Sequence, residues 1–430
     1  MNEYDSSRIL DLLKKSDYEK TENAENADCY LINTCHIREK ATEKVFHDVG
    51  RIKKNYRNKK KPIVLIAGCV AQAEGEVILK NDKYIDAVIG PQSYQELPKV
   101  IKGIEEKRSR ANFTEFETIE KFDQLKLIKN SNTKISSFLT IQEGCDKFCK
   151  FCVVPYTRGP EYSRSFKELI EESKQLIQNG AKEITLLGQN VNAYNSSNKK
   201  LSDLIIQLEN LKGLERIRYT TSHPNDMTDD LIDVHGTSKK LMPHLHLPLQ
   251  SGSTKILKSM NRNHSIDHYF KIIQKLKKRK PNIKFSSDFI IAYPGETEED
   301  FNNTLKVLKS VGFINTYSFV FSARPGTPAD LLSLIEDNIS KKRLQLFQEI
   351  AEKIKIDYRQ TLIEKKAQVL FENRISENKY FGRDEYLNSV IVQSAYNLVG
   401  RNIEIKIKRY NHQTLFGDII ENPSKKNFAA

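Results

Sequence analysis

Short apolar runs alternate with helical segments between residues 135 and 330, and this repeat constrains the fold of the 430-residue chain more than any other feature. Each run has the length and composition of a buried strand. Repeated strand–helix units form a parallel sheet with helices packed outside it, so six units predict a partial (βα)6 barrel. The six predicted strands are Phe138–Ile141, Glu183–Leu187, Ile217–Thr220, His244–Leu249, Phe285–Ile291 and Tyr317–Phe321.

The region before the repeat predicts a second domain. Residues 1–105 contain Cys29–Asn33 and Pro62–Gly68, two apolar runs that end in turn residues, as buried parallel strands do. We therefore predict a small α/β domain there, which places the whole chain in the α/β class. The polar, irregular stretch 106–134 is typical of a linker, and the barrel domain then runs from 135 to 340.

The C-terminal region predicts a connecting helix and a small β-barrel. Apolar residues recur at spacings of three and four from Leu344 to Tyr358, which indicates an amphipathic helix over 341–366. From 367 to 425, short strand-like runs separated by polar turns are typical of a small barrel. The predicted strands are Gln368–Phe371, Ser389–Val392 and Ile403–Ile407.

Three cysteines, Cys145, Cys149 and Cys152, follow the first predicted barrel strand in a CxxxCxxC pattern. A [4Fe–4S] cluster normally takes four thiolates, so three closely spaced ones leave one iron with an open position. Radical enzymes use that position to bind S-adenosylmethionine (SAM), whose reductive cleavage yields a carbon radical. The spacing resembles the signature of the radical-SAM superfamily.

Two other uses of cysteine, a zinc site and a disulfide framework, fit this chain less well than a cluster. Zinc requires four ligands, and neither a histidine nor a cysteine lies between Cys152 and His223. A disulfide framework requires an oxidising compartment, and the N-terminus has no secretory signal. No apolar run reaches the roughly 18 residues of a membrane span, so we expect a cytoplasmic protein with no membrane partner.

The other polar motifs also follow predicted strands, and in such barrels the chemistry lies at the carboxyl ends of the strands. These motifs are Gly188–Asn190, Ser222–Pro224, Gln250–Gly252, Pro294–Thr297 and Arg324–Thr327. A glycine at position 188 lets the backbone approach a ligand closely. We predict that Gly188, Gln189, Gln250, Ser251 and Arg262 contact SAM, although each is also an ordinary turn or surface residue.

The formal charge of +13 favours a polyanionic partner, because clustered Lys and Arg release counterions from nucleic-acid phosphates. Runs such as Lys53–Lys61 are equally common on solvated surfaces, so charge alone leaves RNA binding open. The predicted C-terminal barrel contains a basic set that suits phosphate, although alternating lysines on an exposed sheet also serve solubility. This set is Arg374, Arg383, Arg401, Lys406 and Lys408.

Taken together, the motifs resemble those of the methylthiotransferases, a radical-SAM family, and match almost end to end. Within that family the chain is similar to the MiaB-type enzymes that modify tRNA. The motifs are Met1–Ser6, Asn33–Lys40, Gly159–Glu161, Leu187–Asn192, His246–Gly252 and Tyr293–Thr297. The resemblance implies an N-terminal α/β domain, a radical-SAM barrel and a C-terminal TRAM β-barrel that binds RNA.

The resemblance also implies a reaction, the addition of a methylthio group to C2 of N6-isopentenyladenosine beside the anticodon. Two SAM molecules are implied: one cleaved at the catalytic cysteines Cys145, Cys149 and Cys152, and one that donates the methyl group. Sulfur would come through a second [4Fe–4S] cluster, for which Cys35 and Cys69 are ligands. The implied partners are isopentenylated tRNA, an electron donor such as flavodoxin or ferredoxin, and a sulfur-supply or cluster-carrier protein.

The chain departs from the family at two positions. The family's first auxiliary-cluster cysteine lies two positions before the segment that begins here at Met1, so we expect either a natural start upstream or an altered auxiliary site. Cys29 lies within a predicted strand and is not expected to substitute. Ala292 stands where the family usually has glycine.

Two alternatives to this function remain open. One is methylthiolation of another substrate, a ribosomal-protein aspartate or a threonylcarbamoyl adenosine. The other is a truncated RNA-binding protein without catalytic activity.

Overall fold

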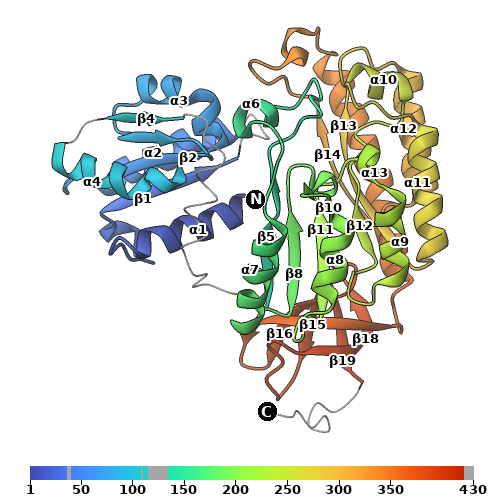
Figure 1. Ribbon diagram of the computed structural model, residues 1–430. Helices are drawn as coiled ribbons and strands as arrows, with labels where there is room; N and C mark the ends of the chain where they lie inside the picture. The colour runs from blue at the N-terminus through green and yellow to red at the C-terminus, as the bar shows by residue number, and fades with distance from the viewer. Residues whose placement is uncertain (36–39, 108–109, 115–133, 421–430) are drawn as a thin grey trace. The chain divides into compact units, whose positions relative to one another are not determined.

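The computed structural model describes residues 1–35, 40–107, 110–114 and 134–420 (Figure 1). The chain forms two compact units. The first contains residues 1–132, 142–164 and 322–331, and the second contains residues 133–141, 165–321 and 332–430. Residues 145–152, with the cysteine motif, lie within the first unit.

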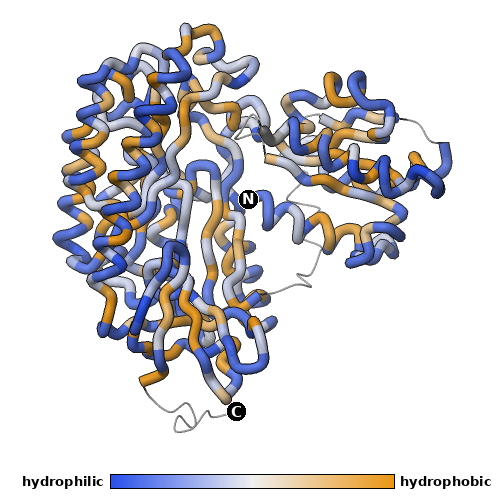
Figure 2. The backbone as a smooth tube through the Cα atoms, turned by 180° about the vertical axis from the view of Figure 1, so that it is seen from behind, coloured by the Kyte–Doolittle hydropathy of each residue, from blue (hydrophilic) through white to orange (hydrophobic). Residues whose placement is uncertain are grey.

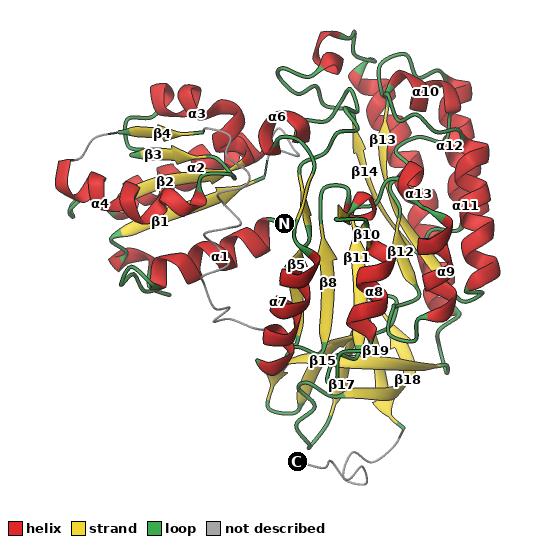
Figure 3. Cartoon of the chain, viewed as in Figure 1, coloured by secondary structure: helices red, strands yellow, loops and turns green. Residues whose placement is uncertain are grey.

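The first unit is built on a four-stranded parallel sheet in the order β1-β2-β3-β4 (Figure 3). Its strands are β1 (Cys29–Thr34), β2 (Ile63–Gly68), β3 (Ala87–Ile89) and β4 (Ala111–Phe113). Its helices are α1 (Asn2–Lys14), α2 (Lys40–Asn55), α3 (Cys69–Asn81) and α4 (Leu97–Lys107). Strand β4 lies within the stretch expected to be a linker, and residues 115–133 of that stretch lie outside the described residues.

Alternate residues of β2 explain why helices cover both faces of this sheet. Val64 and Ile66 pack with α2 and α3 in one core cluster. Leu65 and Ala67 pack with α1 and α4 in a second cluster. A strand buried on both faces reads as a continuous apolar run, which is why the sequence revealed β2.

The cysteine motif is held by a small antiparallel pair in the same unit. Strand β6 (Gln142–Glu143) pairs with β7 (Tyr162–Ser163). The segment that connects the two strands contains the cysteine motif and helix α6 (Val154–Arg158).

The second unit contains the expected partial barrel, made of two parallel sheets in the orders β11-β8-β5 and β12-β13-β14. The Ile217 N–H donates to the Lys240 carbonyl at 2.8 Å and the Met242 N–H donates to the Ile217 carbonyl at 3.0 Å, which joins the two sheets. The strands are β5 (Ser136–Thr140), β8 (Glu183–Leu187), β11 (Arg216–Thr220), β12 (His244–His246), β13 (Lys284–Ile291) and β14 (Asn315–Val320).

Helices flank this barrel, and their hydrophobic and hydrophilic residues alternate around each helix (Figure 2). They bury one apolar stripe each against the strands in a single core cluster. These helices are α7 (Phe166–Gln178), α8 (Leu201–Glu209), α9 (Asp229–Thr237), α10 (Thr254–Ser259), α11 (Ile266–Arg279), α12 (Glu298–Val311) and α13 (Asp337–Gln360). The short hairpin strands β9 (Asn195–Ser196) and β10 (Lys199–Lys200) precede α8.

A closed five-stranded barrel in the order β15-β16-β17-β19-β18 ends the second unit. Its strands are β15 (Lys366–Ser376), β16 (Lys379–Arg383), β17 (Ser389–Gln393), β18 (Asn402–Tyr410) and β19 (Thr414–Ile419). The sequence missed β16 and β19, because each contains a glycine at a close approach of two strands. A Cβ at Gly382 would lie 2.4 Å from the Leu370 carbonyl oxygen, and one at Gly417 would lie 2.5 Å from that of Lys406. The expected residues 421–425 lie outside the described part.

Two buried arginines of β11 attach this C-terminal barrel to the partial barrel. The Arg216 guanidinium donates to the carbonyls of Arg383 at 2.9 Å and Gln368 at 2.7 Å. Arg218 donates to the carbonyls of Glu385 and Asp384, both at 2.9 Å. Among the described residues, no helix combines the length and apolarity that a membrane crossing needs.

Candidate active site

The loop of the three cysteines is closed at its base by tight backbone packing. Gly144 has φ +75°, and a Cβ there would lie 1.9 Å from the Pro160 carbonyl oxygen, so only glycine fits. The Cys145 N–H donates to the Gly159 carbonyl at 3.2 Å, and the Cys152 N–H donates to that of Cys149 at 2.9 Å. These contacts explain why the Gly159–Glu161 motif accompanies the cysteines.

The thiols of this loop are partly withdrawn from water and form no disulfide. Cys149 is buried, whereas Cys145 and Cys152 are half-buried. Burial, with Cys152 and Cys149 acting in the same direction, raises the pKa of Cys145 to about 12. A thiol in this setting stays protonated until a bound metal favours the thiolate.

The donor chemistry of this loop fits an iron–sulfur cluster, which takes thiolates. No three His, Cys, Asp or Glu side chains among the described residues gather around a single metal-ion position. In a cluster, different thiolates bind different irons, so one shared position is not needed.

Cys35 and Cys69 lie next to each other at the carboxyl ends of two paired strands of the N-terminal sheet. They directly follow Thr34 and Gly68, which are paired in the parallel β1–β2 ladder. Gly68 has φ +94°, and a Cβ there would lie 2.2 Å from the Thr34 carbonyl oxygen, so the two strand ends approach closely. Residues 36–39 of the Asn33–Lys40 motif lie outside the described residues.

Cys29 lies at the other end of β1, where it is paired with Ile63. It packs against an apolar core cluster, and burial raises the pKa of its thiol to about 12.

The residues that flank the three cysteines, Glu143 before them and Arg158 after them, form the stem of the cysteine loop. A buried ion-pair network joins this stem to the rest of the first unit. The Arg158 guanidinium contacts the carboxylates of Asp5 at 2.7 Å and Glu143 at 3.3 Å. Gln92, which follows β3, donates to the Arg158 carbonyl at 2.9 Å and to Glu143 at 3.2 Å. Although burial disfavours the charge, the neighbouring Asp5 carboxylate raises the pKa of Arg158.

Sequence reasoning missed this network. One signal was available, since Asp5 belongs to the Met1–Ser6 motif and Arg158 directly precedes the Gly159–Glu161 motif.

The predicted SAM-contact residues all lie in the second unit, four of them after strand ends and Arg262 after helix α10. Gly188 and Gln189 directly follow β8. The Gln250 backbone bridges to β13, because its N–H donates to Asp288 and its carbonyl accepts from Ile290, each at 2.9 Å. The Ser251 hydroxyl accepts from the Ser253 N–H at 3.2 Å, and Arg262 donates to the Pro248 carbonyl at 2.6 Å.

Ala292 also lies after a strand end, and its φ of +58° explains why the family's glycine suits this position. Its N–H donates to the carboxylate of Glu296 at 3.1 Å.

The predicted RNA-contact residues are spread over the C-terminal barrel. Lys406 and Lys408 converge on Glu364 at 2.7 and 3.0 Å. Arg374 and Arg383 belong to the β15–β16 hairpin, where Arg383 contacts Glu372 at 2.7 Å. Arg401 directly precedes β18. The shared partner Glu364 thus brings the two lysines together.

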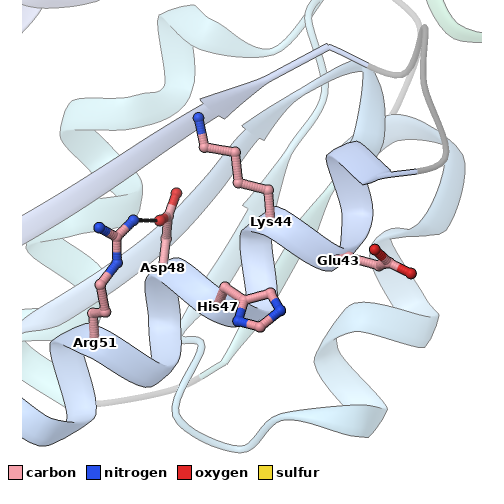
Figure 4. Close-up of a pocket in the computed structure, with 5 residues that line it drawn as sticks. All are labelled: Glu43, Lys44, His47, Asp48 and Arg51. Atoms are coloured by element: carbon pink, nitrogen blue, oxygen red, sulfur yellow. Dashed lines mark hydrogen bonds and ion pairs between the residues drawn. The ribbon is translucent and has the colours of Figure 1, made fainter.

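A polar hollow of about 370 Å³ lies along one helix of the first unit (Figure 4). Its lining residues all come from α2, and Arg51 and Asp48 form an ion pair there. The lining residues are Glu43, Lys44, His47, Asp48 and Arg51.

Comparison with known proteins identifies two family models in the chain. The Radical SAM superfamily model matches residues 139–308. The model described as Uncharacterized protein family UPF0004 matches residues 1–90.

Two relatives that match this chain over nearly its whole length share the same enzyme name. A protein of Pelagibacter ubique named tRNA-2-methylthio-N(6)-dimethylallyladenosine synthase is 55% identical over 99% of this chain and 97% of its own length. One of the same name from Rickettsia akari is 46% identical over 98% of this chain and 97% of its own length.

Solved structures show the same fold at low identity. The radical S-adenosylmethionine methyltransferase TsrM from Kitasatospora setae, with cobalamin and a [4Fe-4S] cluster bound, has a TM-score of 0.57 and 11% identity. The match covers 76% of this chain and 74% of that one.

Proposed function

Because the chain belongs to the tRNA-2-methylthio-N(6)-dimethylallyladenosine synthase family, we propose that it adds a methylthio group to C2 of N6-isopentenyladenosine next to the anticodon. The 55% identity over nearly the whole length of a relative with that name carries the proposal. The CxxxCxxC loop adds the matching chemistry. A ring C–H bond beside two nitrogens is out of reach of general acid–base catalysis, so a cofactor has to supply the reactive species.

Cys145, Cys149 and Cys152 would hold the catalytic cluster. A [4Fe–4S] cluster there, with SAM bound, supplies the radical that breaks the C–H bond. The buried Arg158 network fixes the stem of this loop, so the thiols are preorganised. Gly188, Gln189, Gln250, Ser251 and Arg262 are proposed to bind and orient SAM.

Cys35 and Cys69 are proposed to supply two thiolates to an auxiliary cluster that delivers sulfur. Their support is the β1–β2 pairing that brings both residues to one sheet edge. Replacing Cys145, Cys149 and Cys152 with Ala together tests this site separately. We expect roughly three to four irons to remain bound after anaerobic reconstitution, as a cubane-type cluster requires. Loss of all iron would contradict the second site.

The C-terminal barrel is proposed to hold the tRNA through Arg374, Arg383, Arg401, Lys406 and Lys408. Unpaired loop bases are the parts of RNA that a protein can extrude and read. We further propose flavodoxin or ferredoxin as electron donor, a sulfur-supply or cluster-carrier protein, and the cytoplasm, where tRNA is modified, as the place of action.

The direct test is turnover by the anaerobically reconstituted protein. It is incubated with SAM, a reductant and either isopentenylated or unmodified tRNA, and the digested nucleosides are analysed by mass spectrometry. We expect the methylthio product only from isopentenylated tRNA, and none from a Cys149→Ala variant. Modification of threonylcarbamoyl adenosine or of a ribosomal-protein aspartate instead would overturn the proposed substrate.

A further inference from the structure

The second unit contains a cavity of about 760 Å³ where the partial barrel meets the C-terminal barrel. Strands β5, β8, β11, β12, β13 and β14 line it on one side, and residues 383, 386–389 and 412–413 line it on the other, with Lys355 and Arg359 of α13. Figure 3 shows β15 to β19 lying across the end at which β5, β8 and β11 begin. Its size falls within the roughly 300–1,000 Å³ typical of ligand sites.

Strand register places specific side chains on the cavity wall. Phe138, Thr185 and Arg218 occupy one row across β5, β8 and β11, and all three line the cavity. Across the other sheet, His246 and Ser286 are paired in the ladder and also line it. The wall therefore combines aromatic and polar side chains on an inner sheet face.

Two aromatic side chains of this wall are unusually accessible for barrel strands. Phe138 is 36% exposed and Tyr317 is 49% exposed. The His246 ring packs edge-on against Tyr317 at a centroid distance of 6.0 Å. Asn315 donates to the Tyr317 hydroxyl at 3.1 Å. These contacts orient Tyr317 while they leave much of it open to a stacked ligand.

Most cations of the lining have acidic partners, and Arg359, which also lines the cavity, donates instead to the Asn411 carbonyl at 2.7 Å. Arg218 contacts Glu183 at 2.8 Å and Arg383 contacts Glu372 at 2.7 Å. Lys355 and His412 both contact Glu352, at 3.4 and 3.3 Å. Burial lowers the pKa of His244 to about 3, so this histidine is neutral at pH 7. The cavity therefore suits a planar ligand without net charge rather than a phosphate.

We propose that this cavity receives an unpaired base of the RNA substrate, stacked on Tyr317 and Phe138. The inference rests on the proposed function, which makes RNA the substrate. A base offers a flat face for the aromatic rings and polar edges for groups such as Gln413. We assign it to a base other than the modified one, because the first residues of β5 and β8, Ser136 and Glu183, line the cavity, whereas the chemistry in such barrels lies at the carboxyl ends of the strands.

Binding of isopentenylated tRNA to the reconstituted holoprotein, without reductant, tests the proposal. We expect Tyr317→Ala to raise the Kd about tenfold, as loss of one stacked base does, and Tyr317→Phe to stay within about twofold of wild type. Tyr396→Ala is the matched control, since Tyr396 is 48% exposed and lies outside the cavity. An unchanged Kd for Tyr317→Ala, or an equal loss with Tyr317→Phe, overturns stacking at this residue.

The chain has no tryptophan, so Tyr317→Trp provides a single fluorescent probe inside the cavity. We expect tRNA to quench this tryptophan and to leave that of Tyr396→Trp nearly unchanged. Quenching by adenosine monophosphate but not by tRNA would assign the cavity to a free nucleotide and overturn the proposal.

These measurements are independent of turnover. A protein that binds tRNA through Tyr317 but forms no methylthio product refutes the proposed function alone. A protein that forms the product with unchanged tRNA binding by Tyr317→Ala refutes only the cavity proposal.

Discussion

Arg158 illustrates how a single buried side chain can organise a site made of distant sequence segments. Its two carboxylate partners, Asp5 and Glu143, are both nearly inaccessible to water. Burial of such charges is costly unless each is paired and hydrogen-bonded. The arginine therefore holds helix α1 and the stem of the cysteine loop in one arrangement, because any separation would leave a bare charge.

Replacement of Arg158 by Gln should be strongly destabilising. Removing one member of a buried pair leaves its partners uncompensated and costs about 3–5 kcal/mol. Urea denaturation followed by circular dichroism would measure the loss in free energy of unfolding. The control is Arg374→Gln, whose site is exposed, and which should change that free energy by less than about 1 kcal/mol. An equal, small effect of both variants would contradict the role of the network.

Ala292 should be a point of backbone strain, because its left-handed conformation is unfavourable for a residue with a Cβ. We expect Ala292→Gly to raise the free energy of unfolding by about 1 kcal/mol. The contrasting control is Ala351→Gly, within α13, which should lower it by about 1 kcal/mol. Thermal denaturation would compare the two, and a lower melting temperature for Ala292→Gly would refute the strain.

At the scale of elements, the ends of strands and helices follow local chemistry that the sequence only partly reveals. Strand β8 was predicted to the residue, because it is a continuous buried apolar run. Strand β12 ends at His246, three residues before the prediction, where Pro248 lacks the N–H that a ladder needs. Helix α13 spans Asp337–Gln360 rather than 341–366, because the apolar spacing shows the buried face and not the polar ends.

Helix α12 begins with a capping box that contains Asp300. The carboxyl group of this residue should make the stability of the helix depend on pH. Thr297 and Asp300 cap each other's backbone N–H groups. Although burial acts in the opposite direction, hydrogen bonds from Lys255, Ser253 and Thr297 hold the pKa of Asp300 well below its usual value. The stability gained from this carboxylate is therefore present above its unfolded pKa of about 3.9 and is lost as the pH falls below it.

Asp300→Asn should accordingly cost about 1 kcal/mol of unfolding free energy at pH 7. The difference between wild type and variant should shrink as the pH falls from 5 to 3, because the unfolded chain then binds a proton at this carboxyl that the native state, with its lowered pKa, does not bind. Denaturation midpoints across this range would measure it. A difference that grows toward low pH would exclude the carboxylate as the stabilising form.

At the scale of the whole molecule, Arg216 and Arg218 couple the partial barrel to the C-terminal barrel inside the second unit. Their guanidinium groups donate to backbone carbonyls of residues 368, 383, 384 and 385. Nothing in the sequence around β11 distinguishes these arginines from surface cations. Their role depends on a strand that arrives more than 150 positions later in the chain.

Arg216→Gln should weaken the attachment of the C-terminal barrel to the partial barrel. The hydrophobic core of the C-terminal barrel should stay folded. Three hydrogen bonds to that barrel are lost, and the carbonyls left without a donor each carry a penalty of about 1–3 kcal/mol. Hydrogen exchange should speed up in β15, β16 and β18 relative to α7 and α8. Exchange in β15 equal to that of wild type would show that the barrel is attached by other contacts.

Local periodicity in the chain indicated the α/β class and the partial barrel, and its short motifs carried the resemblance to the family, because these signals all lie within short stretches of sequence. The tertiary contacts brought Asp5, Gln92, Glu143 and Arg158 together, although these residues lie far apart in the chain. The tertiary structure alone enclosed Phe138 and Tyr317 in one cavity. Such contacts join residues far apart in the chain, and their energies arise from burial, which has no local signature in the sequence.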